Sequence, residues 1–336
     1  MTLRFLLPLL SFVGLVILSF RRSGRVLKRW QFLTLMALFL TLGRVLIPGL
    51  SLRWYALFLR IPSILLLGFL SSEWLALEKK SRLHTRDIQE ALSTLALPSH
   101  LAKQKPDVAI VIPVYNEADN LRELLSKIPQ ESMGQRLLVV FVDDGSSDDT
   151  RDILGESGHL VLRTKQNLGK GVALQLGMRV VEKLGVPLLV TMDADGQHSL
   201  EDLPGLLKPL LTSRVDVVVG SRLLGQDADS SVFRRWSLQL HNRVLSFLVG
   251  QKVTDCRNSF RAFRTVVLKK MHPIQESHHS AEFLLEAFGS KCKVVERSIT
   301  LYPRSGKAEG RGGGWEEIRF FKSILISWWR VARGIW

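Results

Sequence analysis

The 336-residue sequence contains only two cysteines, Cys256 and Cys292. Neither belongs to a CxxC motif or has a histidine at metal-ligand spacing, which argues against a disulfide framework and against a zinc site. We therefore expect two reduced thiols in a cytosolic domain. Acidic residues are outnumbered, with 31 aspartates and glutamates against 46 lysines and arginines, so the net charge is +15.

The excess of positive charge is confined to the two ends of the chain. Residues 1–105 contain 15 basic and 4 acidic residues, residues 297–336 contain 8 and 3, and residues 106–296 contain 23 and 24. The nearly neutral middle has no basic stripe with interleaved aromatics, which argues against nucleic acid as a partner. Basic residues beside apolar segments instead suit the anionic headgroups of a cytoplasmic membrane leaflet.

Three apolar stretches near the N-terminus approach the ~20 residues that a helix needs to cross a membrane. They cover residues 3–20, 30–50 and 54–77. Positive clusters at 21–29 and 79–86 would orient three spans so that the following chain lies in the cytosol, because cytoplasmic loops are rich in Lys and Arg. Arg44 and Arg60 interrupt the second and third stretches. They could line a path for a lipid phosphate, or they could snorkel on helices that lie partly in the interface, so the expected number of transmembrane helices is two to three.

The last segment, residues 315–336, has the pattern of an amphipathic helix. Its basic residues, including Arg319, Arg330 and Arg333, recur at helical spacing opposite tryptophans and aliphatic residues. This pattern is typical of a helix that lies in the membrane interface. A helix that docks onto another subunit would carry the same pattern, so a homo-oligomer stays open.

Between these flanks, short apolar runs alternate with amphipathic stretches, which indicates a layered α/β domain with a mostly parallel sheet. The expected strands cover residues 108–114, 137–142, 159–163, 187–192 and 215–220. Helical spacing of leucines predicts a helix over 117–128, and a second helix follows residue 171. Polar clusters come directly after four of the strands. Ligands bind beyond the carboxyl ends of strands in open α/β sheets, so we expect the site at that edge.

An acidic pair, Asp193 and Asp195, follows the fourth strand with Ala194 between the two carboxylates. Carboxylates at that spacing can both present oxygens at a strand end, and hard oxygen ligands without His or Cys favour Mg²⁺ or Mn²⁺. Two carboxylates leave coordination positions for phosphate and water. We therefore expect the metal to arrive with its substrate.

A glycine-containing segment, residues 167–171, precedes the second predicted helix. Gly169 and Gly171 would let the backbone approach a phosphate at a helix N-terminus, where N–H groups are unpaired. A simple helix start explains the same residues. Lys170 is correspondingly either a phosphate contact or a solvated charge.

Together these motifs resemble those of the family 2 glycosyltransferases with the GT-A fold, a Rossmann-like architecture, and within them the polyprenyl-phosphate (dolichol-phosphate) mannosyl- and glucosyltransferases. The resemblance covers about residues 107–310. It is carried by VIPVYNE (111–117), VDDGS (142–146), NLGKG (167–171), MDADGQH (192–198), GSR (220–222), DCRNSFRAF (255–263) and ITLYPR (299–304). The expected organisation is a membrane region at 1–80, a cytosolic linker at 81–106, a catalytic domain at 107–310 and a C-terminal interfacial helix at 311–336.

The resemblance implies roles for individual residues. Contacts to the nucleotide-sugar are implied for Pro113, Tyr115, Glu117, Asp143, Asp144, Lys170, Asp193, Ala194 and Gln197. Ligands of the Mg²⁺ or Mn²⁺ would be Asp193, Asp195 and Gln197. Candidate contacts to an acceptor phosphate are Arg222, Arg261, Arg304 and Lys307. The candidate catalytic residues are Asp195, Arg222, Asp255 and Arg261. The segment assigned to the acceptor departs from the family, which usually has Ser-Gly where this chain has Asn258-Ser259.

The activity implied by the resemblance is inverting, metal-dependent transfer of a hexose from a GDP- or UDP-sugar to a polyprenyl or dolichyl phosphate at the cytoplasmic membrane face. A phosphate monoester, with a second pKa of about 6, is mostly ionised at neutral pH and needs no base. A hydroxyl acceptor needs one, for which Asp255 and Glu282 are the candidates.

Two alternatives remain. The first is a non-processive transferase that acts on a hydroxyl of a glycolipid or glycan. The second is a catalytically inactive membrane scaffold that keeps the fold, against which the intact Asp193, Asp195 and Arg222 argue.

Overall fold

The computed structural model describes residues 105–227, 232–275, 279–303 and 314–332, together with residues 72, 75–80 and 88. The three predicted membrane stretches lie outside the described residues, apart from a few positions at the end of the third. Of the helices that the structure does describe, none combines the length and the apolar character that a membrane crossing requires.

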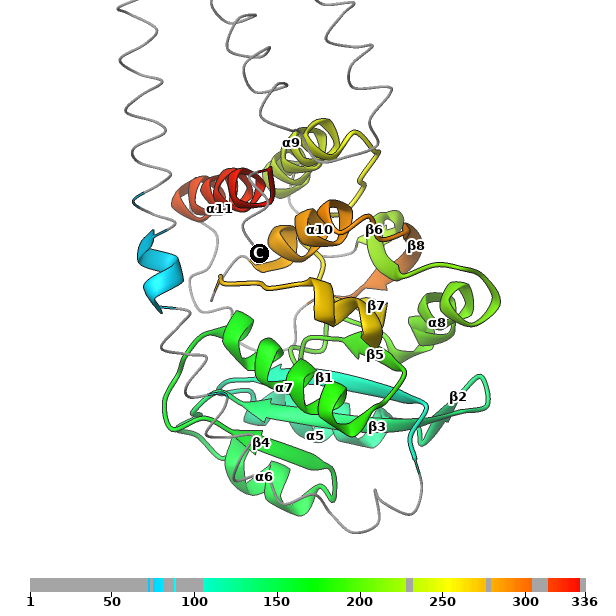
Figure 1. Cartoon of the computed structure of the whole chain (residues 1–336). Helices are drawn as coiled ribbons and strands as arrows, with labels where there is room; N and C mark the ends of the chain where they lie inside the picture. Colours follow the sequence, from blue (N-terminus) through cyan, green and yellow to red (C-terminus); the bar gives the residue numbers. More distant parts are fainter. Residues whose placement is uncertain are drawn as a thin grey trace, which may run out of the picture.

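The described residues build an eight-stranded mixed sheet with helices on both faces (Figure 1). Its strands are β1 (Val108–Val114), β2 (Glu131–Ser132), β3 (Gln135–Asp143), β4 (Leu160–Arg163), β5 (Leu188–Thr191), β6 (Val217–Asp227), β7 (Arg261–Arg264) and β8 (Val294–Leu301). The α-helices are α5 (Ala118–Lys127), α6 (Thr150–Glu156), α7 (Lys170–Leu184), α8 (Leu203–Thr212), α9 (Val232–Val249), α10 (His279–Gly289) and α11 (Gly314–Ala332). Two short 3-10 helices cover Leu200–Asp202 and Thr265–Lys270.

The sheet runs in the order β2-β3-β1-β5-β7-β6-β8, and β4 pairs with β3. β1 is parallel to both β3 and β5, and β3 is parallel to β4. β7 is antiparallel to β5 and to β6, so β6 runs in the same direction as β5. The five predicted strands are thus confirmed as β1, β3, β4, β5 and β6, and their carboxyl ends share one edge.

Two strands, β7 and β8, go beyond the prediction. β7 has four residues with an arginine at each end, and β8 has Glu296 and Arg297 at its centre, so neither shows a clear apolar pattern. β7 is held in place by Arg264, whose guanidinium donates to the carbonyl oxygens of Leu210 (2.6 Å) and Val215 (2.8 Å). Its position between β5 and β6 brings the segment 255–263 to the centre of the sheet.

The core has two layers, one on each face of the sheet. Alternate side chains of β1 enter different layers, because successive residues of a strand point to opposite faces. Ile110 and Ile112 pack with α5, α6 and α8, whereas Ala109 and Val111 pack with α7 and α10. α7 lies so close to the sheet that a side chain at Gly177 would have its Cβ 2.4 Å from Val111 Cγ1.

The predicted C-terminal helix is confirmed as α11, which lies beside α9 and α10 (Figure 1). Its predicted basic stripe, however, is not entirely directed outward. The Arg319 side chain is 67% exposed, but the Arg330 side chain is 3% exposed and pairs with Glu282 and Glu286 of α10. The expectation of an exposed basic face is therefore wrong at Arg330, because this arginine is the cation that pairs with two buried carboxylates. The tryptophans opposite the stripe, Trp328 and Trp329, are 6% and 5% exposed, because they pack in the protein core. Arg333, also assigned to the stripe, lies outside the described residues.

Candidate functional site

The turns that follow β1 and β3 are joined at the carboxyl edge of the sheet. Asn116 donates its backbone N–H to Ser146 Oγ (3.0 Å), and its side-chain oxygen accepts the N–H of Ser147 (2.9 Å). Asn116 has a φ of 51°, a left-handed conformation in which asparagine is enriched. Polar clusters from two separate strand ends thus form one surface, as the sequence predicts.

Several residues assigned to the nucleotide lie along this edge. Pro113 is buried in β1, whereas Tyr115 is 39% exposed. Asp143 is buried at the end of β3, and its Oδ1 accepts the N–H of Ser146 (2.8 Å). Arg163, the last residue of β4, lies 3.4 Å from Asp143 Oδ2. Sequence reasoning does not single out Arg163, although its position at the end of a predicted strand is the available signal.

Two other residues assigned to the donor are Glu117 and Asp144. In this structure their carboxylates accept hydrogen bonds from neighbouring residues of the protein. Glu117 Oε2 accepts the side-chain N–H of Asn120 at 2.5 Å. Asp144 accepts the backbone N–H of Leu168 (2.9 Å) through Oδ1 and that of Gly169 (2.8 Å) through Oδ2. Burial raises the pKa of Asp144, and these hydrogen bonds only partly offset it. In this structure Asp144 shapes the glycine segment, and its contact with the donor stays a prediction.

The acidic pair Asp193 and Asp195 follows β5. Ala194 between them is 3% exposed and packs in the core layer of α5, α6 and α8. The Lys170 ammonium lies 2.5 Å from Asp193 Oδ1, which makes it a charge partner inside the site. Burial acts to raise the pKa of Asp193, but Lys170 and His198 outweigh burial and hold that pKa below its ordinary value.

The turn after Asp195 is tied to the end of β8. Asp195 is 6% exposed, and its Oδ1 accepts the N–H of Gln197 (3.2 Å). The Gln197 side chain donates to the carbonyl oxygen of Tyr302 (3.3 Å), and the Gln197 carbonyl accepts the N–H of Tyr302 (2.9 Å). Arg304 and Lys307 follow Tyr302 in the chain and lie outside the described residues.

The oxygens at this strand end fit Mg²⁺ or Mn²⁺. They come from two carboxylates and an amide, which are hard ligands. In the described part of the chain, the buried Asp193 Oδ1 has its ion pair with Lys170 but no hydrogen bond of ordinary geometry. No group of three or more His, Cys, Asp and Glu residues is placed to hold a metal among the described residues.

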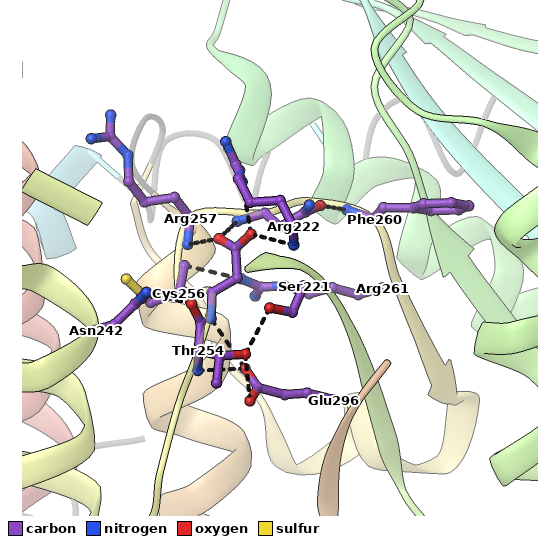
Figure 2. A network of polar contacts seen from close by, with 11 residues as sticks. Ser221, Arg222, Asn242, Thr254, Cys256, Arg257, Phe260, Arg261 and Glu296 are labelled. Carbon is purple, nitrogen blue, oxygen red and sulfur yellow. Dashed lines mark hydrogen bonds and ion pairs between the residues drawn. The ribbon is translucent and has the colours of Figure 1, made fainter. Parts of the chain in front are cut away.

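A second group of polar residues lies around Asp255, just before β7, and includes Arg222, Arg257 and Glu296 (Figure 2). Asp255 Oδ2 accepts the Arg222 Nε–H (2.7 Å) and backbone N–H (3.1 Å). Its Oδ1 accepts the backbone N–H groups of Arg257 (3.3 Å) and Asn258 (3.2 Å). A carboxylate has about four acceptor positions, and here four donors use them. Asp255 is fully buried, whereas the Arg222 side chain is 20% exposed.

Glu296 of β8, which the sequence does not single out, binds the backbone of the segment that contains Asp255. Its Oε1 accepts the backbone N–H groups of Thr254 (2.8 Å) and Asp255 (3.1 Å). The Thr254 hydroxyl lies 2.7 Å from the hydroxyl of Ser221, the residue before Arg222. The segment that contains Asp255 is thereby fixed against β6 and β8 (Figure 2).

Arg261, predicted to contact the acceptor, is 2% exposed in this structure. Its guanidinium donates to the carbonyl oxygens of Ser280 (2.6 Å) and Cys256 (3.2 Å). Burial lowers the pKa of Arg261 to about 10. Arg261 therefore joins the segment 255–261 to the start of α10, and its contact with an acceptor stays a prediction.

A further arginine, Arg257, was not predicted as a site residue. Its guanidinium binds both carboxylate oxygens of Glu317 in α11, at 2.9 and 2.7 Å, and lies 4.7 Å from the centre of the Phe320 ring. Ser237 of α9 donates to the same carboxylate. Helices α9 and α11 are thus connected to the segment that holds Asp255.

The acidic pair and Arg222 both influence the electrostatics of one histidine, His198. His198 packs against Phe260 with the ring centres 5.1 Å apart and the ring planes tilted by 38°. Burial is the main cause that lowers the pKa of His198; the carboxylates of Asp193 and Asp195 raise it, whereas Lys170 and Arg222 lower it further. The acidic pair and Arg222 are therefore close enough to share one electrostatic environment.

Glu282, the other candidate base, lies away from this arrangement in α10. It is fully buried, and its two oxygens accept the backbone N–H groups of Ile274 (3.0 Å) and Gln275 (2.9 Å). Oε1 also binds Arg330 at 3.1 Å. These contacts leave no exposed oxygen for an acceptor hydroxyl.

Comparison with known proteins defines the class. A family model described as glycosyl transferase family 2 matches residues 109–271. An uncharacterized protein of Methanocaldococcus jannaschii is 32% identical over 216 residues, which cover 61% of this chain and 86% of that protein. The chain belongs to glycosyltransferase family 2 and is a glycosyltransferase.

Two named relatives are similar to parts of the chain. An undecaprenyl-phosphate 4-deoxy-4-formamido-L-arabinose transferase of Edwardsiella ictaluri is 33% identical over 55% of this chain, and the match spans 57% of that relative's length. A UDP-N-acetylglucosamine–dolichyl-phosphate N-acetylglucosaminyltransferase of Methanococcus voltae is 27% identical, over 60% of this chain and 89% of that protein.

Among solved structures, glucosyl-3-phosphoglycerate synthase of Mycobacterium tuberculosis is similar, with a TM-score of 0.53 and 19% sequence identity. The match covers 67% of this chain and 80% of that one. That enzyme was crystallised with Mn²⁺, uridine diphosphate and phosphoglyceric acid. At this identity the likeness shows the fold, which agrees with the predicted GT-A-like α/β sheet.

Proposed function

We propose that this glycosyltransferase transfers a hexose from a UDP- or GDP-sugar, with inversion and with Mg²⁺ or Mn²⁺, to a polyprenyl or dolichyl phosphate. The observation that carries the proposal is the hydrogen bonding of the Asp255 carboxylate. Its four acceptor positions are used by N–H donors, among them Arg222. A carboxylate in that state is a poor general base, so the site suits an acceptor that is already ionised.

The reaction would proceed by in-line displacement. An acceptor phosphate oxygen forms a bond to the anomeric carbon, while the bond from that carbon to the diphosphate breaks and its electron pair leaves with the nucleoside diphosphate. A bound metal would offset the charge that develops on this leaving group. Asp193, Asp195 and Gln197 would hold that metal, and Arg222, oriented by Asp255, would attract the acceptor phosphate.

The names of the two relatives support a lipid phosphate as acceptor. One is named for undecaprenyl phosphate and the other for dolichyl phosphate. The chain's own basic flanks agree with a lipid substrate, because they would hold the near-neutral catalytic middle at an anionic leaflet.

The helices next to Arg257 agree with a position at the membrane. α9 exposes Trp236 (59%) and Phe247 (47%), and α11 exposes Ile318 (58%) and Phe321 (36%). We propose that residues 1–80 anchor the chain, that residues 107–310 form the catalytic domain on the cytoplasmic side, and that the helix over 311–336 faces the membrane. Exposed tryptophan and aliphatic side chains are common at such interfaces.

The test is a transfer assay with the full chain in detergent, radiolabelled UDP- and GDP-hexoses, and Mg²⁺ or Mn²⁺. Undecaprenyl phosphate and dolichyl phosphate are compared with the corresponding free polyprenols. We expect a mild-acid-labile lipid product with a phosphate and none with a polyprenol. An acid-stable glycolipid formed from a membrane lipid extract would instead favour the hydroxyl acceptor. The absence of turnover with every donor and acceptor would favour the inactive scaffold.

A further inference from the structure

The ammonium group of Lys170 lies next to the carboxylate oxygen of Asp193 that would bind a metal ion. The ammonium is 2.5 Å from Asp193 Oδ1, at the first residue of α7. A divalent ion such as Mg²⁺ binds carboxylate oxygens at about 2.0–2.1 Å. A cation on the same carboxylate would thus lie close to the lysine nitrogen. Like charges at such a separation repel strongly, and a divalent ion repels an ammonium twice as strongly as a monovalent ion does.

The backbone at Lys170 is held in place. Asp144 binds the N–H groups of Leu168 and Gly169, the two residues before the lysine. Gly169 has a φ of 99°, a left-handed conformation that favours glycine. Any response to a metal must therefore come from the Lys170 side chain, which has a flexible four-carbon stem.

The Lys170 side chain can change its conformation because it borders solvent. It is 40% exposed, and the Asp193 side chain is 21% exposed, so the ion pair borders solvent. Lys170 also begins α7, where unpaired backbone N–H groups attract anions. A diphosphate that arrives with its metal would bring negative charge for the ammonium and would leave Asp193 to the metal.

We propose that Lys170 is an exchangeable counter-ion of Asp193. The lysine neutralises the carboxylate while the donor site is empty, weakens the binding of a metal by itself, and moves to the diphosphate when metal and nucleotide bind together. This inference rests on the proposed nucleotide-sugar donor. It explains physically why the metal and the donor would enter the site as one unit.

The test measures Mn²⁺ binding, without catalysis, by electron paramagnetic resonance of free Mn²⁺ during titration of the detergent-solubilised full chain. UDP and GDP are tested separately. We expect wild-type protein to bind Mn²⁺ weakly and to bind it at least about tenfold more tightly with one of the nucleotides. Lys170→Met should bind Mn²⁺ alone about tenfold more tightly than wild type, equivalent to about 1.4 kcal/mol, and should gain less from the nucleotide.

Two variants control for charge and position. Lys170→Arg keeps a cation and should bind Mn²⁺ alone as weakly as wild type. Lys127→Met removes an ammonium 2.6 Å from Glu123 on the exposed face of α5, and it should change nothing. Unchanged Mn²⁺ affinity in Lys170→Met would overturn the inference.

Asp195→Ala separates this inference from the proposed function. If Asp195→Ala loses Mn²⁺ binding while Lys170→Met behaves as wild type, the metal site stands and the counter-ion role is wrong. If Asp195→Ala binds Mn²⁺ as well as wild type does, the metal assignment in the proposed function is wrong, and the counter-ion role falls with it.

Discussion

Asp195 is the side chain on which we expect the donor side of the site to depend most. Asp195→Ala takes away a proposed metal ligand and also the acceptor of the Gln197 N–H (3.2 Å). We expect transfer to fall about 1,000-fold, equivalent to about 4 kcal/mol of transition-state stabilisation. The measurement is kcat with radiolabelled donor, beside circular dichroism to verify the fold. Asp152→Ala, on the exposed side of α6, is the matched control. Near-normal turnover in Asp195→Ala would refute the assignment.

Asp255 offers a test of positioning against general-base catalysis. If Asp255 acts through Arg222, then Asp255→Asn, Arg222→Gln and the double variant should lose similar activity, because residues in contact are not additive. If Asp255 is a base, its loss should add a further decrease in the Arg222→Gln background and should change the acid side of the pH profile of kcat/KM. We expect the non-additive result and an unchanged pH profile.

The turn between β3 and α6 depends on a glycine. Gly145 has a φ of 73°, and a Cβ at this position would lie 2.6 Å from the backbone carbon of Gln166. Gly145→Ala should therefore destabilise the protein by about 1–3 kcal/mol and should weaken nucleotide binding, because the neighbouring Asp144 orders the segment before Lys170. Chemical denaturation and nucleotide titration measure the two effects. Gly155→Ala, where nothing lies within 4 Å of the added Cβ, is the control.

The junction of α10 and α11 depends on one buried cation. Arg330→Met would leave Glu282 and Glu286 unpaired in the interior, which should cost about 3–5 kcal/mol of unfolding free energy near neutral pH. The exposed Arg319→Met should cost less than about 1 kcal/mol. Denaturant unfolding of both variants in detergent gives the comparison. Similar stabilities would show that α11 is not held by this pair.

The same variant has a defined pH dependence. Burial already raises the pKa of Glu282 with Arg330 present, and removal of the cation should raise it further. The folded variant then binds protons more readily than the unfolded chain, so its stability should increase as the pH falls and decrease as the pH rises. We expect a smaller loss from Arg330→Met at pH 5 than at pH 8. A loss that does not depend on pH would contradict this account.

The distribution of charge along the chain predicts its orientation. The catalytic middle should be digested by added protease in inside-out membrane vesicles and protected in right-side-out vesicles, because the basic clusters at 21–29 and 79–86 favour the cytoplasmic side. Blotting with an antibody against the catalytic domain gives the readout. Digestion in right-side-out vesicles would contradict the orientation that we propose.

The parallel strands and the acidic pair were predictable because their signals are local. A short apolar run predicts a buried strand, and the five predicted runs correspond to β1, β3, β4, β5 and β6. Polar clusters directly after four of these runs mark the turns at the strand ends. The free thiols and the α11 helix follow from equally local patterns. The carboxyl ends of the five predicted strands share one edge of the sheet, which is where the sequence places the candidate site residues.

The long-range contacts of the fold could not be predicted in this way. In the candidate site, Asp255 binds Arg222 across 33 residues of chain. Outside the site, at the junction of α10 and α11, Arg330 binds Glu282 across 48. Both depend on strand and helix packing: β7 enters between β5 and β6, and α11 lies against α10. Local periodicity contains no information on such pairings, because hydrophobic patterns select a face and not a partner. The sequence therefore identifies the chemistry of the edge, and only tertiary packing decides which charges are exposed there and which are neutralised inside.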